Sequence, residues 1–224
     1  MRLAALAAAL LFRAAVLSAQ QLDQGGRTMG SKDDRILWVY PNYRTVDADN
    51  SFPRISPREK LTIAARDSFD PYAFPIAGVF AGIAYSEDRD ASWGRGTDRY
   101  GKLYFAALAD QTMSNLMAEA AFPILLHQDP RYFRLGRGGL LHRVGYAASR
   151  MFVTRSDSGE PEFNYSEFAG NAAMAAAGNL YYPRDDRAFG NVASRFGTQI
   201  AFDLVANVAQ EFWPDVKGWL VRTF

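Results

Sequence analysis

The densest group of chemically capable side chains lies in residues 125–133, LLHQDPRYF. His127 and Asp129 stand two residues apart, and an imidazole that titrates near pH ~6.5 beside a carboxylate can serve as a general base. With Arg131 assisting, the segment can be interpreted as the catalytic group of a hydrolase. The favoured interpretation is structural, because a histidine at a helix C-terminus can bond exposed carbonyls, Asp-Pro marks a turn and Arg131 can pair with Asp129.

The sequence offers no motif for a metal or an organic cofactor. It has no cysteine and only two histidines, His127 and His142, and neither lies in an HExxH or ExxH spacing. A GxSxG motif, a P-loop and a GxGxxG motif between a strand and a helix are also absent. We therefore predict neither a metal site nor a cofactor site.

Polar residues spaced by four suggest another candidate site on two of the predicted helices. One stripe comprises Gln199, Asp203, Asn207 and Glu211, and the other comprises Gln111, Asn115 and Glu119. If both stripes face inward, they could form a buried polar site with two carboxylates. The outward orientation is favoured, because an amphipathic helix normally turns its polar face to solvent.

The composition is that of a folded, nearly neutral chain. Of 224 residues, 49% are hydrophobic and 14% aromatic, and 25 basic side chains face 24 acidic ones. The apolar content excludes wholesale disorder, and the length suits one domain or two small ones. A net charge of +1 gives no electrostatic reason to expect a nucleic-acid partner.

The first 19 residues have the features of a secretory signal peptide. Met1-Arg2 precedes an uncharged apolar run over residues 3–12, and small residues follow before a polar stretch. We predict a cut after Ala19, with a cut after Ser18 nearly as good and an ordinary amphipathic helix as the alternative. Residues 20–34 are polar and contain glycine, which predicts a flexible tether. The predicted localisation is therefore export, to the periplasm or the outer-envelope surface.

The remaining residues, 35–220, predict one all-α domain. Proline, glycine and aspartate divide them into five or six helices, expected over 57–70, 74–85, 98–126, 140–154, 164–181 and 188–213. Ser56 and Glu59 fit a capping box around a proline at the first helical position. The β-branched and aromatic residues of 36–46 predict a short extended segment before the bundle.

Small residues spaced by four predict helix faces that pack closely. Gly78 and Gly82 form one such pair, and further sets are Gly170, Met174 and Gly178, and Ala193, Gly197 and Ala201. The uncharged runs 71–86 and 168–183 are 16 residues each, which is shorter than the ~20 residues of a spanning helix. A soluble bundle is favoured, with an integral membrane assembly as an alternative. Tyr181-Tyr182, Trp213 and Trp219 could be interfacial aromatics or core residues.

An ordered set of motifs gives the chain a resemblance to a known family. The motifs are VYPNYRTVD (39–47), SPREKL (56–61), FDPYAF (69–74), LLHQDPRYFR (125–134), RVGYAASRMFVTRSDSG (143–159), FNYSE (163–167), NLYYP (179–183) and EFWPD (211–215). Over residues 35–215 the chain resembles a family of exported bacterial proteins of unknown function. The resemblance implies export and a single domain, and it implies no catalytic residues.

These observations predict an exported helical protein of the cell envelope with a non-enzymatic, structural or membrane-surface role. A membrane surface or an envelope protein is the expected partner, and self-association is open. An envelope hydrolase that uses His127 and Asp129 and an integral membrane helical assembly are the two alternatives.

Overall fold

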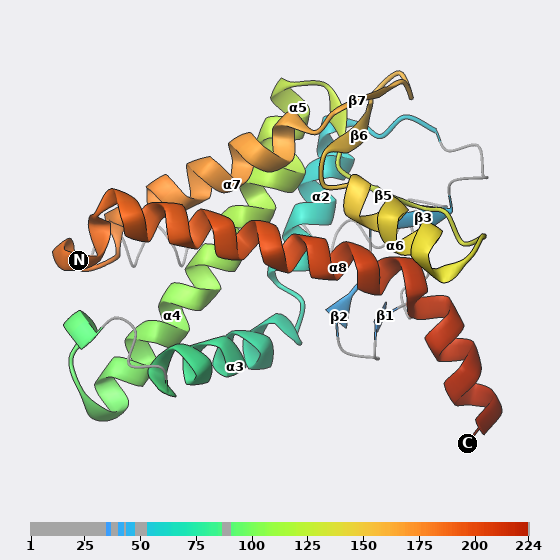
Figure 1. Ribbon diagram of the computed structural model, residues 1–224. Coiled ribbons are helices and arrows are strands. Elements are labelled where there is room, and N and C mark those ends of the chain that lie inside the picture. The colour runs from blue at the N-terminus through green and yellow to red at the C-terminus, as the bar shows by residue number, and fades with distance from the viewer. Residues whose placement is uncertain (1–34, 37–39, 43, 48–52, 87–90, 224) are drawn as a thin grey trace.

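The computed structural model describes residues 35–223 except 37–39, 43, 48–52 and 87–90 (Figure 1). The predicted signal peptide, 1–19, and the predicted tether, 20–34, lie outside the described residues. Within the described part the chain is mostly helical with a few short strands, so the expected all-α class holds in that coarser form.

The first two helices occur where the sequence predicts them. α2 (Pro57–Ser68) begins at a capping box, in which the Glu59 N–H donates to the Ser56 hydroxyl at 3.3 Å and the Ser56 N–H donates to the Glu59 carboxylate at 2.6 Å. A turn at Asp70, whose side chain accepts a backbone hydrogen bond from two residues on, leads into α3 (Ala73–Ser86).

The predicted long helix is a rod made of three segments. After the 3₁₀ turn η2 (Ala91–Trp93), it comprises α4 (Gly96–Ser114), the π-helical η3 (Asn115–Ala121) and α5 (Phe122–Leu125). No pattern in the sequence predicts the π-helix, in which each backbone hydrogen bond spans one more residue than in an α-helix.

The C-terminal half adds α6 (Leu140–Ser149), α7 (Tyr165–Ala177), η4 (Gly178–Leu180), η5 (Arg184–Arg187) and α8 (Phe189–Thr223). α7 and α8 cross the rod, and α8 changes direction toward its C-terminus (Figure 1). Its predicted end at Trp213 is too early, because α8 continues through Pro214. Trp213 is only 2% exposed, so the residue before Pro214 lies in the packed interior, and a proline within a helix can bend it without ending it.

Short strands connect the helices, and the sequence predicts only the extended stretch before the bundle. β1 (Arg35–Ile36) pairs antiparallel with β2 (Tyr40–Pro41), β3 (Thr45–Asp47) pairs parallel with β5 (Tyr132–Arg134), and β4 (Gln128–Asp129), β6 (Val153–Ser156) and β7 (Pro161–Phe163) form an antiparallel sheet. The helix expected over 140–154 ends at Ser149. Val153 and Thr154 are β-branched and suit a strand, and the Thr154 hydroxyl donates to the Asp129 carbonyl at 2.9 Å.

The small-residue faces are used unequally. A Cβ on Gly170 would lie 2.6 Å from Cα of Ala118, so α7 and η3 can approach this closely only because residue 170 is glycine. Gly78 lies against Tyr100 and Tyr104 of α4, whereas a Cβ on Gly82 would meet nothing within 4 Å. Close packing therefore explains Gly170 but not Gly82.

No helix in the described part of the chain combines the length and apolar character that crossing a membrane requires.

Candidate functional site

Of the three residues that the sequence predicts as a site, the structure joins Asp129 to Arg131 and leaves His127 outside the pair. His127 follows α5, is exposed and has a positive φ of 57°. Asp129 is 6% exposed and accepts from Arg131 at two points, from Nε at 3.0 Å and from Nη2 at 2.6 Å. The Arg131 backbone N–H also donates to Asp129 at 3.0 Å. Asp129 and Arg131 are thus brought together, but no hydrogen bond joins His127 to Asp129 among the described residues.

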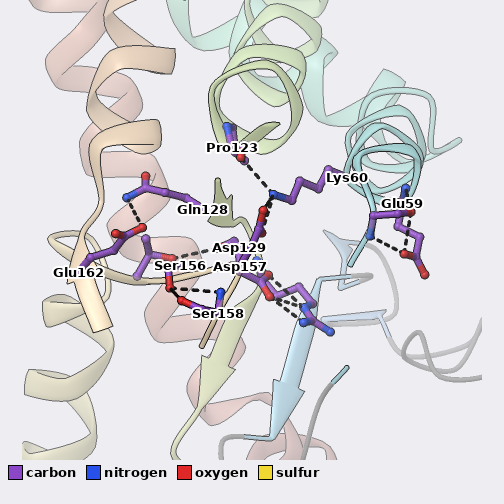
Figure 2. A network of polar contacts seen from close by, with 12 residues as sticks. Glu59, Lys60, Pro123, Gln128, Asp129, Ser156, Asp157, Ser158 and Glu162 are labelled. Carbon is purple, nitrogen blue, oxygen red and sulfur yellow. Dashed lines mark hydrogen bonds and ion pairs between the residues drawn. The ribbon is translucent and has the colours of Figure 1, made fainter. Parts of the chain in front are cut away.

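A buried lysine joins three elements beside this segment (Figure 2). Lys60 of α2 is 1% exposed, and its ammonium donates to the Asp157 carboxylate at 2.6 and 2.9 Å and to the Pro123 carbonyl at 3.0 Å. Figure 2 shows Lys60 pointing from α2 toward the turn that carries Asp157. Because the ammonium donates all three of these hydrogen bonds within the protein, Lys60 links α2 to α5 and to the β6–β7 turn. No pattern in the sequence marks Lys60 as a buried residue.

Gln128, also labelled in Figure 2, links its segment to β7 and α7 by hydrogen bonds. Its amide nitrogen donates to the Glu162 carboxylate at 2.9 Å and to the Phe163 carbonyl at 2.7 Å. Its amide oxygen accepts from the Ser166 N–H at 2.8 Å. The part of LLHQDPRYFR around residue 128 therefore positions β7 and the start of α7.

The polar stripes of the long helices face inward, which corrects the favoured outward orientation. Glu119 is 5% exposed, Asn207 8% and Glu211 0%. On the other side of α8, Val205 is 66% exposed. The polar face of α8 is buried because it lies against other polar groups that form hydrogen bonds with it.

Four carboxyl groups from four elements meet at the centre of the helices. We call them the carboxyl core: Asp67 of α2, Glu119 of η3, Glu167 of α7 and Asp203 of α8. Charge interactions among these groups and with Arg44 contribute to their pKa values. Glu119 and Asp203 belong to the polar stripes that the spacing predicts, whereas no pattern in the sequence marks Glu167 or Asp67 as members of a site.

Amide and hydroxyl groups hold the α7 and α8 sides of the carboxyl core together. The Asn171 side chain donates to Glu167 at 2.8 Å and to Asp203 at 3.1 Å. Its amide oxygen accepts from the Ser114 hydroxyl at 2.7 Å. Asn171 is 0% exposed, so this amide binds both carboxyl groups from within the helix packing.

Burial is the main cause that raises the pKa of every carboxyl group in the core. The pKa of Asp67 rises to about 6, although the Arg44 guanidinium opposes the shift. The pKa values of Glu119 and Glu167 lie well above the usual range, because each is buried and faces another acidic group. Burial also raises the pKa of Asp203. Arg44 lowers the pKa of each of the four groups, but the effect of burial is larger, so every member of the core keeps a raised pKa.

The π-helix positions one member of the carboxyl core. Glu119 lies inside η3, the segment Asn115–Ala121. Gly170 of α7 lies against Ala118, the residue before it. The wider turn of a π-helix shifts the helix face by about one residue, and such turns occur frequently at functional sites.

A cavity of about 40 Å³ adjoins the core and is lined by Arg44, Ser166, Glu167, Asp203 and Asn207 among others. Ser166 Oγ is buried without a hydrogen-bond partner. A water molecule needs roughly 10–15 Å³ of such space, whereas pockets for organic ligands have about 300–1,000 Å³. The cavity thus suits a few waters and does not suit an organic substrate.

A separate buried centre forms around Glu211 of α8. Its carboxylate accepts from the Tyr132 hydroxyl at 2.9 Å, from the Leu135 and Gly136 N–H groups at 3.0 and 2.9 Å, and from Arg143 Nε at 2.9 Å. Burial and the neighbouring Glu211 raise the pKa of Tyr132. The centre joins β5, α6 and α8, and four donors leave the carboxylate no free capacity for a substrate.

The aromatic pair of NLYYP belongs to the packed interior. The hydroxyls of Tyr181 and Tyr182 both donate to Asp110 of α4, the second at 2.6 Å. Arg195 lies over the Tyr182 ring, 4.3 Å from its centroid. Trp213 is also buried, whereas Trp219 is 61% exposed. Of the proposed interfacial aromatics, only Trp219 is largely exposed.

Within the described residues, no group of three or more histidine, aspartate or glutamate side chains is arranged to hold a metal ion. Comparison of the chain with family models, with curated proteins and with solved structures finds no match.

Proposed function

We propose that this chain is an exported, non-enzymatic protein of the cell envelope that binds a membrane surface through α3. The observation that carries the proposal is the outer face of α3, where Val79 is 63% exposed and Ile83 47% exposed. The preceding sites offer no rival, because their charged groups bind one another and the cavity is too small for an organic substrate.

α3 is apolar on all sides. It carries no charged residue over Ala73–Ser86. Ala73, Ala77 and Ala81 are buried, and Ala81 belongs to one core cluster with Leu103 and Ala106 of α4. A helix that is apolar all round is normally buried on all sides, so the exposed side of α3 requires an apolar partner.

A lipid surface fits this face better than a protein does. Tyr72 before the helix and Tyr85 near its end are each 39% exposed, and tyrosines favour the boundary between hydrocarbon and water. A protein interface carries about one hydrogen bond per 100–200 Å², whereas the outer face presents the apolar Val79 and Ile83. With 14 residues, α3 reaches about 21 Å, so it would lie in the interface without spanning it.

Vesicle flotation tests the proposal with the protein purified as the cell processes it. We expect the protein to float with vesicles of phosphatidylcholine alone, because α3 has no charge to make binding depend on anionic lipid. Val79→Ser with Ile83→Ser should weaken binding at least tenfold, since burying each such side chain contributes about 1.5–3 kcal/mol. Leu180→Ser is the matched control, because Leu180 is 83% exposed and lies in η4.

Several results would overturn the proposal. Wild-type protein that stays in the soluble fraction would remove lipid binding, and equal flotation of the α3 variant would remove α3. Loss of concentration-dependent self-association in that variant, without any lipid binding, would assign the face to a second copy of the chain. N-terminal sequencing tests export, which an uncut Met1 in the cytoplasm would contradict.

A further inference from the structure

Arg44 is the cation that the four members of the carboxyl core share. Its Nη1 lies 2.9 Å from the Glu119 carboxylate, and the two side chains are 13% and 7% exposed. Glu119 Oε2 and Asp67 Oδ1 are buried and have no hydrogen-bond partner. The Asp67 and Glu119 carboxyl groups interact with each other, and Arg44 is the cation beside them.

Arg44 comes from outside the helices that form the core. It immediately precedes β3, and its carbonyl accepts from the Tyr132 N–H of β5 at 3.0 Å. Thr45 donates to Gln210 of α8 at 3.1 Å, and Asp47 forms an ion pair with Arg134. Residues 44–47 therefore lie along β5 while the Arg44 side chain enters the carboxyl core.

We propose that the carboxyl core is a binding site for a guanidinium group, that Arg44 fills it in cis, and that protons compete with the guanidinium, so that acidification loosens residues 44–47 from the helices. Each proton taken up by a carboxylate removes a negative charge that attracts Arg44. Docking of Arg44 and proton binding are therefore linked with opposite signs.

The charges around Arg44 support this linkage from every element of the core. They are Asp67 on α2 with Arg66 and Asp70 beside it, Glu119 on η3, Glu167 on α7 and Asp203 on α8, and the Asp129–Arg131 pair and Arg150 line the adjoining cavity. Arg44 lowers the pKa of each core carboxyl group against the larger effect of burial. By reciprocity, ionisation of the same groups strengthens the docking of Arg44. With Arg44 docked the pKa of Asp67 is about 6, and without Arg44 it would be higher, so for this group the competition falls at and above pH ~6.

Hydrogen exchange of the wild-type chain is the first test. Protection of the peptide covering residues 44–47, corrected for intrinsic exchange rates, should fall as the pH is lowered from 8 to 5. The expected loss is about tenfold for each unit by which Arg44 lowers the pKa of a core carboxyl group. The β6 strand, Val153–Ser156, should keep its protection and serves as the internal control. Equal protection of residues 44–47 at both pH values would overturn the proposal.

Chemical rescue is the second test. Arg44→Ala should lose protection of residues 44–47 at pH 8, and methylguanidinium should restore it in part, whereas tetramethylammonium at the same ionic strength should not. At pH 4.5 methylguanidinium should have no effect. Arg134→Ala is the matched control, because its guanidinium pairs with Asp47 at the same strand pair, where Asp47 is 49% exposed. Rescue by both cations, or at both pH values, would overturn the proposal.

Glu119→Gln keeps the test decisive if Arg44→Ala does not fold. This variant preserves the side-chain shape and removes the carboxylate that lies 2.9 Å from Arg44. We expect weaker protection of residues 44–47 at pH 8 and a smaller change between pH 8 and pH 5. Wild-type protection and pH dependence in this variant would count against the carboxyl core as the site that holds Arg44.

Discussion

Replacement of Glu211 tests most directly how the buried polar groups stabilise the fold. Its side chain is 0% exposed, and its carboxylate accepts hydrogen bonds from Tyr132, Leu135, Gly136 and Arg143. Glu211→Ala leaves all four donors without this acceptor in a region that water does not reach. Glu211→Gln keeps the shape, but it removes the charge and turns an NH₂ group toward donors.

The expected cost follows from the pair with Arg143. Removing one partner of a buried ion pair costs about 3–5 kcal/mol. Arg143 keeps its contact with Asp215 at 2.7 Å, so we expect Glu211→Gln near the lower end and Glu211→Ala near the upper end of that range. Total stabilities are about 5–15 kcal/mol, so the alanine variant should unfold readily.

Urea unfolding followed by circular dichroism measures this loss. For a chain of this kind a loss of about 3 kcal/mol lowers the midpoint by roughly 1–3 M urea. Asp215→Asn is the control, because Asp215 is 58% exposed on the other side of the same arginine, and an exposed pair contributes about 0–1 kcal/mol. If Glu211→Gln and Asp215→Asn shift the midpoint equally, the argument that burial governs the energy of this centre is wrong.

Three further changes have expected outcomes. Asp67→Asn should gain stability relative to wild type as the pH rises from 4 to 8, by up to about 3 kcal/mol. The pKa of Asp67 is raised to about 6, so the stability that its protonated form contributes is complete below pH ~4 and is lost as the pH rises through ~6. Urea unfolding curves whose midpoints change in parallel for both proteins across this range would contradict the prediction. Gly170→Ala should destabilise the fold by about 1–3 kcal/mol, since its Cβ would lie 2.6 Å from Ala118 Cα. Gly82→Ala has open space around the new Cβ and should stabilise the fold by up to about 1 kcal/mol. In thermal unfolding the melting temperature should fall for the first variant and rise for the second. Ser56→Ala should cost about 1 kcal/mol through loss of the capping box, and an unchanged melting temperature would show that α2 does not depend on its cap.

The sequence predicts helices well where local chemistry decides them. The Ser56 capping box and the Asp70 turn each depend on side chains within four residues. The strands have only two to four residues each, too few to show an alternating pattern. β3 and β5 also pair across 87 positions of sequence, which no local pattern records.

The carboxyl core and the Glu211 centre were harder to predict, because a polar stripe has the same spacing whether it faces water or other polar groups. Glu119 and Asp203 each belong to one of the two polar stripes that the spacing shows, but Arg44 and Asp67 come from segments with no such polar stripe. Only the fold shows that α2, η3, α7 and α8 each supply a carboxyl group to one place. The packing of Gly170 against Ala118 brings two of these elements together.

Some charged side chains of this chain are buried while some large apolar side chains are exposed, and this distribution bears on its proposed role. Charged groups such as Lys60 and Glu211 are fully buried, while large apolar side chains such as Val79, Leu141 and Leu180 are 63%, 86% and 83% exposed. Buried ion pairs contribute little net stability but fix which groups can meet, so part of the interior consists of charged groups and part of the apolar surface lies outside. That leaves apolar surface available outside, which in water would favour aggregation. We infer that a lipid boundary is where such a surface is satisfied, and that α3, apolar and uncharged throughout, is the part that meets it.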